Sequence, residues 1–348
     1  MTNATTATAP KIFARKAIGD RMYADTTVSA NRALQAIASN PNSKVRVWKG
    51  SLPHAVPSPI KGYAFPKKAL ALLNAHLLGD ELKTHGLWIW GLHGTGKTSL
   101  VEQFAALTKA EVYNLNGTGT TEFRELVGQY VLQSQGDSQP TMQFVEGPLV
   151  TAMRRGAILL INEVDIINPA ELAGLYDVLE GKPIQLPTGE MVKPEESFRL
   201  ICTANTGGFG DRSGHFGGTG VMSKPFMDRF NVVQLGYIDP AAERQLLEDR
   251  FEVTKQALAG KPMSLIMVEL AKKVREQFAG PDGDGTGDLS STISTRGLCR
   301  WAELVDQFAG QHGALTTCLE FTVLNACPPE DREVIQGLYE AISGLAQP

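Results

Sequence analysis

The sequence has few cysteines, no long apolar run and no large excess of either charge. Its 348 residues include 4 cysteines and 6 histidines, and neither type has the paired spacing of a disulfide framework or a structural zinc site. No stretch of about 18 apolar residues occurs, and the N-terminal segment lacks the apolar core of a signal peptide. We therefore expect a cytoplasmic protein, in a reducing compartment, without membrane contact.

The charge balance argues against nucleic acid as a partner. The 33 Lys and Arg residues face 37 Asp and Glu residues, which gives a formal net charge of -4 and no general attraction to a phosphate backbone. Hydrophobic residues make up 43% of the chain, enough to fill a core. At roughly one domain per 150 residues, the length predicts about two domains.

Short apolar runs alternate with helical patterns up to residue 238, and the pattern is then entirely helical. The five runs lie at residues 87–90, 111–115, 157–161, 200–203 and 232–235. Strands that alternate with helices form parallel sheets, so the predicted fold class is α/β, with a five-stranded parallel sheet in residues 51–238. Residues 239–348 are predicted to form a smaller helical domain, and residues 1–50 a poorly defined arm whose first twenty residues are a mobile tail.

Two helices of the second domain are predicted from local patterns. Apolar residues recur at i+4 spacing from Ile266 to Phe278, which predicts a helix that Gly280 ends. The charged residues between them, Arg275 included, are expected to point to solvent. Asp239, which a proline follows, is expected to be the N-cap that starts a helix containing Leu246 and Phe251.

Residues 91–98 have the sequence GLHGTGKT, which fulfils the pattern GxxxxGK[ST] between an apolar strand and a helical pattern. The glycines allow backbone N–H groups to surround phosphate oxygens, and the helix N-terminus adds about half a positive charge. Lys97 is predicted to neutralise the β- and γ-phosphates of ATP, and Thr98 to bind Mg²⁺. The predicted nucleotide-binding residues are Gly91, His93, Gly94, Thr95, Gly96, Lys97, Thr98 and Ser99.

A second polar segment follows the apolar run at 157–161. Glu163 stands where a P-loop ATPase places the carboxylate that polarises water, and it is the predicted general base. The alternative is that Glu163 only caps the next helix. Asn162 occupies the metal position and, as a neutral amide, weakens the Mg²⁺ site by one charge. Asp165 would compensate only if the end of the strand curls back.

Three further residues complete the predicted catalytic set. Asn205 follows the run at 200–203, and because parallel strands end at one edge, it would lie near Glu163 and hold the attacking water. The simpler alternative is an ordinary turn residue. Arg229 precedes the fifth run and Arg296 opens a helix of the second domain. Either guanidinium would neutralise charge on the γ-phosphate, although a solvated surface arginine is the simpler interpretation from the residues alone.

Segments over most of the chain resemble AAA+ ATPases of the MoxR group and, within it, the small ATPase subunits of aerobic cobaltochelatases. These segments are HGTGKTSLVEQFAAL (93–107), FVEGPLVTAMRRG (144–156), TANTGGFGDRSGHFGGTG (203–220), FMDRF (226–230) and GDLSSTISTRGLCRWAEL (287–304). The likeness extends from about residue 55 to residue 345. Asn162 departs from the family pattern, which usually has Asp at this position.

The resemblance implies a role for each predicted residue. Lys97 and Thr98 would be the Walker A pair, Glu163 the Walker B base, Asn205 sensor 1, Arg296 sensor 2 in the same subunit, and Arg229 the finger that enters a neighbour's site. A finger that acts on a neighbour implies a homo-oligomeric ring, which is usually a hexamer in this family.

Two turn signals predict β-hairpins at residues 130–144 and 184–193. Each contains alternating stretches on both sides of a turn rich in Gly, Ser, Thr or Pro. By the resemblance, the first is the insert in helix 2 of the family and the second is the hairpin before sensor 1. Both are expected to project from the ligand-binding edge of the sheet toward the pore of the ring.

The resemblance implies an ATPase that works as a ring motor. In the leading hypothesis, hydrolysis of ATP with Mg²⁺ moves the helical domain against the α/β domain and remodels a protein partner, a separate chain with a von Willebrand factor A domain. The second hypothesis is the ATPase subunit of a metal chelatase, which works with a large subunit to insert cobalt into a corrin. The third, motivated by Asn162, is a scaffold that assembles with ATP and hydrolyses it weakly.

Overall fold

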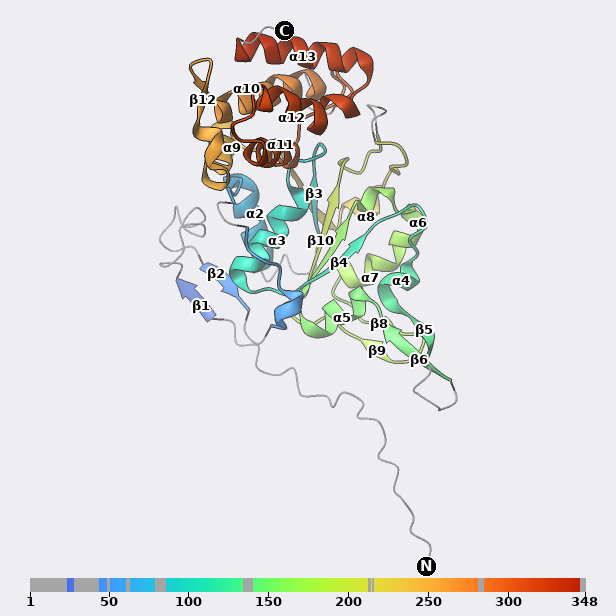
Figure 1. Cartoon of the computed structure of the whole chain (residues 1–348). Helices are drawn as coiled ribbons and strands as arrows, with labels where there is room; N and C mark the ends of the chain where they lie inside the picture. The colour runs from blue at the N-terminus through green and yellow to red at the C-terminus, as the bar shows by residue number, and fades with distance from the viewer. Residues whose placement is uncertain are drawn as a thin grey trace, which may run out of the picture.

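The computed structural model describes residues 24–27, 44–48, 51–60, 63–78, 86–133, 140–211, 214, 216–280 and 285–344. In this part of the chain, an α/β unit carries a bundle of helices above one end of its sheet (Figure 1). The predicted mobile tail at residues 1–20 lies outside the described residues. None of the described helices has both the length and the hydropathy that a membrane span requires.

The α/β unit is built on one five-stranded sheet. Its strands are β3 (Gly86–Trp90), β4 (Val112–Asn116), β7 (Ile158–Asn162), β10 (Arg199–Ala204) and β11 (Phe230–Gln234). They lie in the order β11-β3-β10-β7-β4, and every neighbouring pair is parallel. The predicted five-stranded parallel sheet is therefore confirmed, with small shifts at the strand ends. The central strands β7 and β10 are buried along their whole length, as expected where helices cover both faces.

Helices cover the two faces of this sheet in separate layers. One face packs against α2 (Lys67–Leu78) and α3 (Lys97–Thr108). The other face packs against α4 (Phe123–Val127), α5 (Pro148–Arg155), α6 (Pro169–Leu172), α7 (Tyr176–Leu179) and α8 (Lys224–Met227). Alternate residues of β7 serve the two layers, with Ile158 in one and Leu159 in the other, because side chains alternate across a strand.

Residues before position 51 also contribute to this core. The pair of β1 (Ala24–Thr27) and β2 (Lys44–Val47) is antiparallel. Val45 and Trp48 are buried in the layer of α2 and α3, and the backbone N–H of Trp48 donates to the carbonyl oxygen of Thr108 at 2.8 Å. Part of the segment that the sequence assigned to a poorly defined arm thus packs on the α/β unit.

The helical domain has a core of its own. It contains α9 (Pro240–Arg250), α10 (Met263–Ala279), α11 (Thr295–Gln307), α12 (Ala314–Thr322), α13 (Pro329–Ser343) and the short strands β12 (Ala257–Leu258) and β13 (Lys261–Pro262). Short 3-10 helices of the chain lie at Pro53–Ala55, Val164–Ile166, Ala173–Leu175, Glu252–Lys255 and Leu324–Ala326. The predicted cap of α9 is present, because Asp239 Oδ1 accepts hydrogen bonds from the backbone N–H groups of Ala241 and Ala242.

The expected orientation of Arg275 was wrong. Only 6% of Arg275 is exposed, and its guanidinium nitrogens donate to both carboxylate oxygens of Glu243 at 2.8 and 2.9 Å. The helix α10 contacts α9, α11 and α13, so its polar side also meets other elements. Apolar periodicity identifies the most hydrophobic face of a helix and leaves open what covers the other faces.

Both predicted hairpins form, but at the other end of the sheet from the expected one. They are β5 (Gly128–Gln133) with β6 (Thr141–Glu146), and β8 (Ile184–Gln185) with β9 (Met191–Val192). Arg154, at the C-terminal end of α5, forms ion pairs at 2.8 Å with Glu146 and Glu190. Since α5 leads directly into the start of β7, the hairpins lie where strands begin, away from the phosphate loop and the helical domain (Figure 1).

Candidate nucleotide site

Residues 91–98 form a tight loop between β3 and α3. Gly96 has a left-handed conformation with φ of 84° and stands at the N-terminus of α3. Gly94 also has a positive φ, of 76°, and a Cβ atom there would lie 2.1 Å from the Cβ of Ser294. Glycine is thus required at Gly94 because the loop touches the helical domain directly.

The Lys97 side chain crosses this loop. Its Nζ donates to the carbonyl oxygens of Gly91 at 2.7 Å and Leu92 at 3.2 Å, and to Asn205 Oδ1 at 3.1 Å. Burial lowers the pKa of Lys97 to about 8, which the charges of Asp165 and Glu163 partly oppose. The structure therefore brings the predicted phosphate lysine and the predicted sensor Asn205 into contact, although they are far apart in sequence.

Thr98 and Asn162, the two predicted Mg²⁺ ligands, are also in contact. Thr98 Oγ1 donates to Asn162 Oδ1 at 2.8 Å, and Thr203 Oγ1 donates to the same oxygen at 3.1 Å. Asn116 Oδ1 accepts from the Asn162 amide at 3.1 Å, which fixes its orientation. Hydroxyl and amide oxygens are hard ligands of the kind that Mg²⁺ accepts. The oxygens of Thr98 and Asn162 therefore suit Mg²⁺, although neither carries a charge. Elsewhere in the described residues, no group of three or more His, Cys, Asp or Glu side chains could hold a metal.

Glu163 follows Asn162 in an unusual backbone conformation. Its φ is 52° and its ψ is 41°, the left-handed region, which non-glycine residues rarely adopt. Such strain persists where surrounding structure enforces it, typically at functional sites. The side chain is exposed at the end of β7, next to the strand that Asn205 follows, and is thus free to meet a substrate.

Asp165 has a different position from the one that would compensate for Asn162. Its Oδ2 accepts hydrogen bonds from the backbone N–H groups of Asn205 and Thr206, both at 2.9 Å, and from Thr206 Oγ1 at 3.1 Å. Asp165 is fully buried, and burial raises the pKa of its carboxyl against these hydrogen bonds. Instead of joining Thr98 and Asn162, Asp165 fixes the backbone of Asn205.

Arg229 lies at the opposite end of β3 from the phosphate loop. Its carbonyl oxygen accepts from the backbone N–H of Gly86, the first residue of β3. Its guanidinium contacts Glu180 through Nε at 3.0 Å and lies 4.7 Å from the centre of the Tyr176 ring. Since a parallel strand advances about 3.3 Å per residue, β3 separates Arg229 from the loop of its own chain by roughly 15 Å. The structure does not bring Arg229 to the other predicted residues.

Arg296 lies in the first turn of α11 and lines a cleft of about 330 Å³ together with Gly94, Thr95, Gly96 and Ser99. The pKa of the nearby His93 imidazole is lowered. The main cause is partial burial, and the positive charges of Lys97 and Arg296 add to it. The cleft has the size of a small-molecule site. It opens between the phosphate loop and the helical domain, so α11 forms one wall of the candidate nucleotide site.

The apolar wall of this cleft was missed from the sequence. It is formed by Ile60, Tyr63, Ile238, Leu246 and Cys299. The only sequence signal was the proline-rich segment before α2, which places Ile60 and Tyr63 on an extended stretch. Ile60 is held there because its backbone N–H donates to Gln103 Oε1 at 2.6 Å. A larger cavity of about 610 Å³ lies within the helical domain and contains none of the predicted site residues.

Two family comparisons match separate parts of the chain. Residues 86–230 match the AAA domain of the dynein-related subfamily, and residues 253–345 match the C-terminal domain of CbbQ, NirQ and NorQ. The first match spans the parallel sheet with its phosphate loop, and the second spans most of the helical domain. The chain thus combines an AAA domain with the C-terminal domain of the CbbQ, NirQ and NorQ proteins.

Three curated proteins are similar to this chain at comparable identity. The cobaltochelatase subunit CobS of Sinorhizobium sp is 29% identical over 260 residues, which are 73% of this chain and 74% of that protein. An uncharacterized protein of Staphylococcus haemolyticus is 28% identical over 193 residues, 55% of this chain and 66% of that protein. Midasin of Dictyostelium discoideum is 29% identical over 226 residues, 64% of this chain and 4% of that protein.

Among solved structures, a mutant RuvB of Thermotoga maritima superposes with a TM-score of 0.46 at 17% identity, over 80% of this chain and 77% of that one. The likeness to the MoxR group that the sequence segments indicated is thus confirmed by the two family matches. Of the predicted residues, five line the cleft beside the helical domain, namely Gly94, Thr95, Gly96, Ser99 and Arg296. Lys97 and Thr98 follow in the same loop and contact Asn205 and Asn162, whereas Arg229 lies apart from all of them.

Proposed function

We propose that the chain binds ATP in the cleft beside Arg296 and hydrolyses it. The observation that carries this proposal is the contact of Lys97 Nζ with Asn205 Oδ1 at 3.1 Å, beside strand β7, which Glu163 follows. Lys97 would neutralise the phosphates, Asn205 would hold the attacking water, and Glu163 would accept its proton. Ile60 and Tyr63 would pack against the base.

Thr98 and Asn162 would hold Mg²⁺. The ion supplies positive charge to the phosphate oxygens when it is bound. Because both ligands are neutral, most of the compensating charge would come from the nucleotide, and Asn162→Asp is expected to raise the turnover number. An unchanged rate in that variant would show that the amide is adequate.

The position of Arg229 supports a ring in which each site is shared by two subunits. Arg229 lies at the far end of β3 from its own phosphate loop, so a role at the γ-phosphate requires the loop of another copy. A homo-oligomeric ring, with a hexamer as the expected state, provides this arrangement. In such a ring the helical domain would move against the α/β unit during hydrolysis and transmit this motion to a protein partner.

A mixing experiment tests this proposal. Glu163→Gln and Arg229→Ala should each abolish ATP hydrolysis by the full chain. Mixed subunits should recover activity, because about a quarter of the interfaces in a random ring combine an intact base with an intact finger. Turnover per subunit should also rise with protein concentration, alongside assembly measured by light scattering. Inactive mixtures would refute the shared site, and a wild type that does not hydrolyse ATP would refute the proposed activity.

The similarity to CobS supports a second candidate, the ATPase subunit of a metal chelatase. Its partner would be a large subunit with a von Willebrand factor A domain, and the motor would drive insertion of cobalt into a macrocycle. Cobalt insertion by the chain with such a subunit, dependent on Glu163, is the test. If no cobalt is inserted with any authentic partner, the chelatase function is excluded and the remodelling motor is retained. A turnover that Glu163→Gln does not change would instead favour the nucleotide-gated scaffold.

A further inference from the structure

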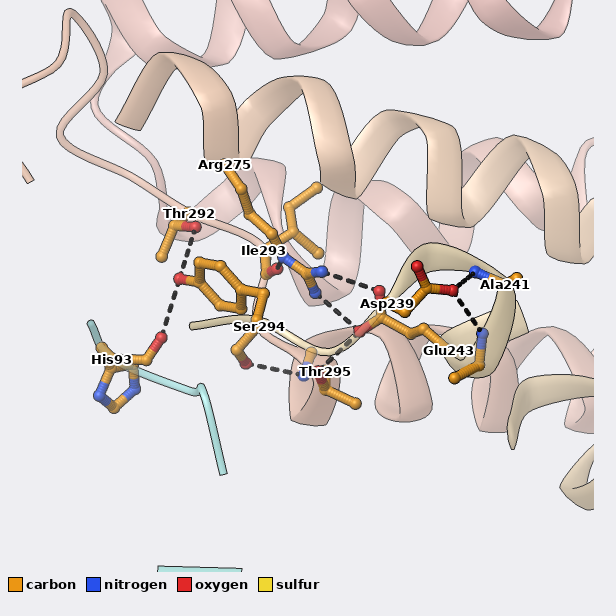
Figure 2. Close-up of polar contacts among 12 residues, drawn as sticks. His93, Asp239, Ala241, Glu243, Arg275, Thr292, Ile293, Ser294 and Thr295 are labelled. Carbon is orange, nitrogen blue, oxygen red and sulfur yellow. Dashed lines mark hydrogen bonds and ion pairs between the residues drawn. The ribbon is translucent and has the colours of Figure 1, made fainter. Parts of the chain in front are cut away.

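A chain of polar contacts joins the phosphate loop to the helical domain through Tyr237, and Figure 2 shows these contacts between His93 and Thr292. Tyr237 Oη donates a hydrogen bond of 2.9 Å to the carbonyl oxygen of His93 and lies 3.3 Å from Thr292 Oγ1. Burial raises the pKa of Tyr237, so the phenol keeps the proton that this bond requires. Tyr237 stands between β11 and α9, where the chain passes from one domain to the other.

Arg275 lies against the Tyr237 ring and uses every side of its guanidinium. The guanidinium carbon is 4.3 Å from the ring centre, Nε donates to the carbonyl oxygen of Ile293 at 2.7 Å, and the two terminal nitrogens contact Glu243 (Figure 2). The Glu243 side chain is fully buried and the Arg275 side chain is 7% exposed. A buried bidentate pair has one strongly preferred geometry, so it holds three segments in fixed positions.

Glu243 also contacts the first residue of α11. Its Oε1 accepts a third hydrogen bond, of 2.6 Å, from Thr295 Oγ1 at the first residue of that helix. Ser294 caps the same helix by accepting from the backbone N–H of Gly297 at 3.0 Å, and Ser294 also touches Gly94 of the phosphate loop. The first turn of α11 is therefore held by Glu243 on one side and the loop on the other, and this turn carries Arg296.

We propose that Tyr237, Arg275 and Glu243 are positioning residues that fix the first turn of α11 and thereby aim Arg296 at the phosphate loop. This inference rests on the proposed function, because Arg296 is taken to contact the γ-phosphate. None of the three needs to touch the nucleotide. A displacement of a catalytic group by about 1 Å can cost on the order of a hundredfold in rate, so a rigid support of this kind has a direct effect on turnover.

Single hydroxyl groups allow a test that keeps the fold. Tyr237→Phe removes the bond to the phosphate loop and retains the ring on Arg275, and Thr295→Val removes the bond to Glu243. Each is expected to lower kcat about tenfold while KM for ATP and the affinity for ADP change little, since the geometry around the γ-phosphate is what is lost. Thr295→Ser, which keeps the hydroxyl, should restore kcat.

The matched control is Tyr339→Phe. Tyr339 is a buried tyrosine of the helical domain, and its hydroxyl lies 2.9 Å from Thr316 Oγ1. Removal of this hydroxyl should leave kcat unchanged. An equal loss in Tyr237→Phe and Tyr339→Phe would mean that the effect is merely one of stability, and it would overturn the inference.

A double-mutant cycle with Arg296 separates positioning from independent effects. Tyr237→Phe should cause no further loss of kcat in an Arg296→Ala background, because residues that act through one another are not additive. Losses that simply multiply would overturn the inference while leaving ATP hydrolysis by the wild type in place. A wild type without ATP hydrolysis would instead contradict the proposed function.

Hydrogen exchange gives a readout that needs no nucleotide. The backbone amides of residues 297–299 should exchange about tenfold faster in Tyr237→Phe and Thr295→Val than in the wild type or Tyr339→Phe, because local opening of the α11 turn becomes easier. Unchanged exchange in both variants would show that the network does not hold this turn, whatever the ATPase rates are.

Discussion

Two arginine–glutamate pairs of this molecule are similar in chemistry and opposite in setting. In the helical domain, the side chains of Arg275 and Glu243 are 7% and 0% exposed. At the start of β11, those of Arg229 and Glu180 are 26% and 36% exposed. A buried pair cannot separate without leaving an uncompensated charge, whereas a solvated pair separates at little cost. The first pair is thus suited to fixing a geometry, and the second to releasing an arginine toward another subunit.

The largest expected effect comes from the exposed pair. Arg229→Ala should reduce ATP turnover in assembled protein by about 10³ or more, the range measured for arginine fingers. The urea midpoint of unfolding should not change, because the guanidinium is partly solvated in the single chain. Turnover and unfolding are measured on the same preparation. A large loss of stability with little loss of turnover would reverse the assignment of the two arginines.

Disruption of the buried pair of Arg275 and Glu243 is expected to reduce stability, unlike disruption of the exposed pair. Arg275→Met should lower the free energy of unfolding by about 3–5 kcal/mol, since Glu243 stays buried without a partner. Arg275→Met combined with Glu243→Leu should recover most of that stability but not the turnover, because the apolar pair no longer holds Thr295. Urea unfolding with a kcat measurement checks both parts, and Arg229→Met is the matched control. Recovery of turnover in the double variant would contradict the positioning role.

Lys97 is intermediate between the buried and the exposed arginine. It is partly buried, and its three hydrogen-bond acceptors are all neutral. Its pKa of about 8 lies below the usual range because of burial. Phosphate binding requires the protonated form, so ADP affinity should be constant below pH 8 and fall by up to about tenfold per pH unit above it.

Calorimetry of ADP binding in the presence of EDTA, from neutral pH to about pH 10, measures this dependence on Lys97 alone. Lys97→Arg is the control, because a guanidinium does not titrate in this range. An affinity of the wild type that stays level across the whole range would contradict the assignment of this lysine to the phosphates.

The smallest effect is expected from Glu180. Glu180→Gln keeps an acceptor for Arg229 but removes the charge that retains it, so half-maximal turnover should occur at a protein concentration about twofold lower. Asp177→Asn is the control, because Asp177 pairs with Lys182 at 3.7 Å and also lies on this surface. A shift of equal size in the two variants would point to general charge repulsion between subunits.

Features that depend on neighbouring residues in the sequence could be predicted. The phosphate loop from Gly91 to Thr98 needs only a strand before it and a helix after it, and both were visible as apolar patterns. The parallel sheet followed from the alternation of strands and helices. The position of Asn205 beside the end of β7 followed as well, because neighbouring parallel strands end at one edge of the sheet, whereas its contact with Lys97 was not predicted.

Features that depend on the third dimension could not be predicted. The left-handed backbone of Glu163 has no sequence signal, and neither has the position of Asp165, which binds the backbone of Asn205 instead of joining Thr98 and Asn162. Arg275 was placed in solvent because periodicity ranks the faces of a helix without counting the elements around it. The hairpins were recognised from their turns, but turn residues carry no information about the end of the sheet at which a hairpin lies.

Arg154 at the end of α5 connects the hairpin β5–β6 to the hairpin β8–β9. One guanidinium pairs with a glutamate from each of them, and because both pairs are partly exposed to solvent, they hold the hairpins side by side without fixing them rigidly. That helix runs straight into β7, whose other end bears Asn162 and Glu163. The two hairpins are therefore attached to one helix at the opposite end of β7 from the predicted catalytic residues, and the helix and the strand are the covalent connection between the two ends of the sheet.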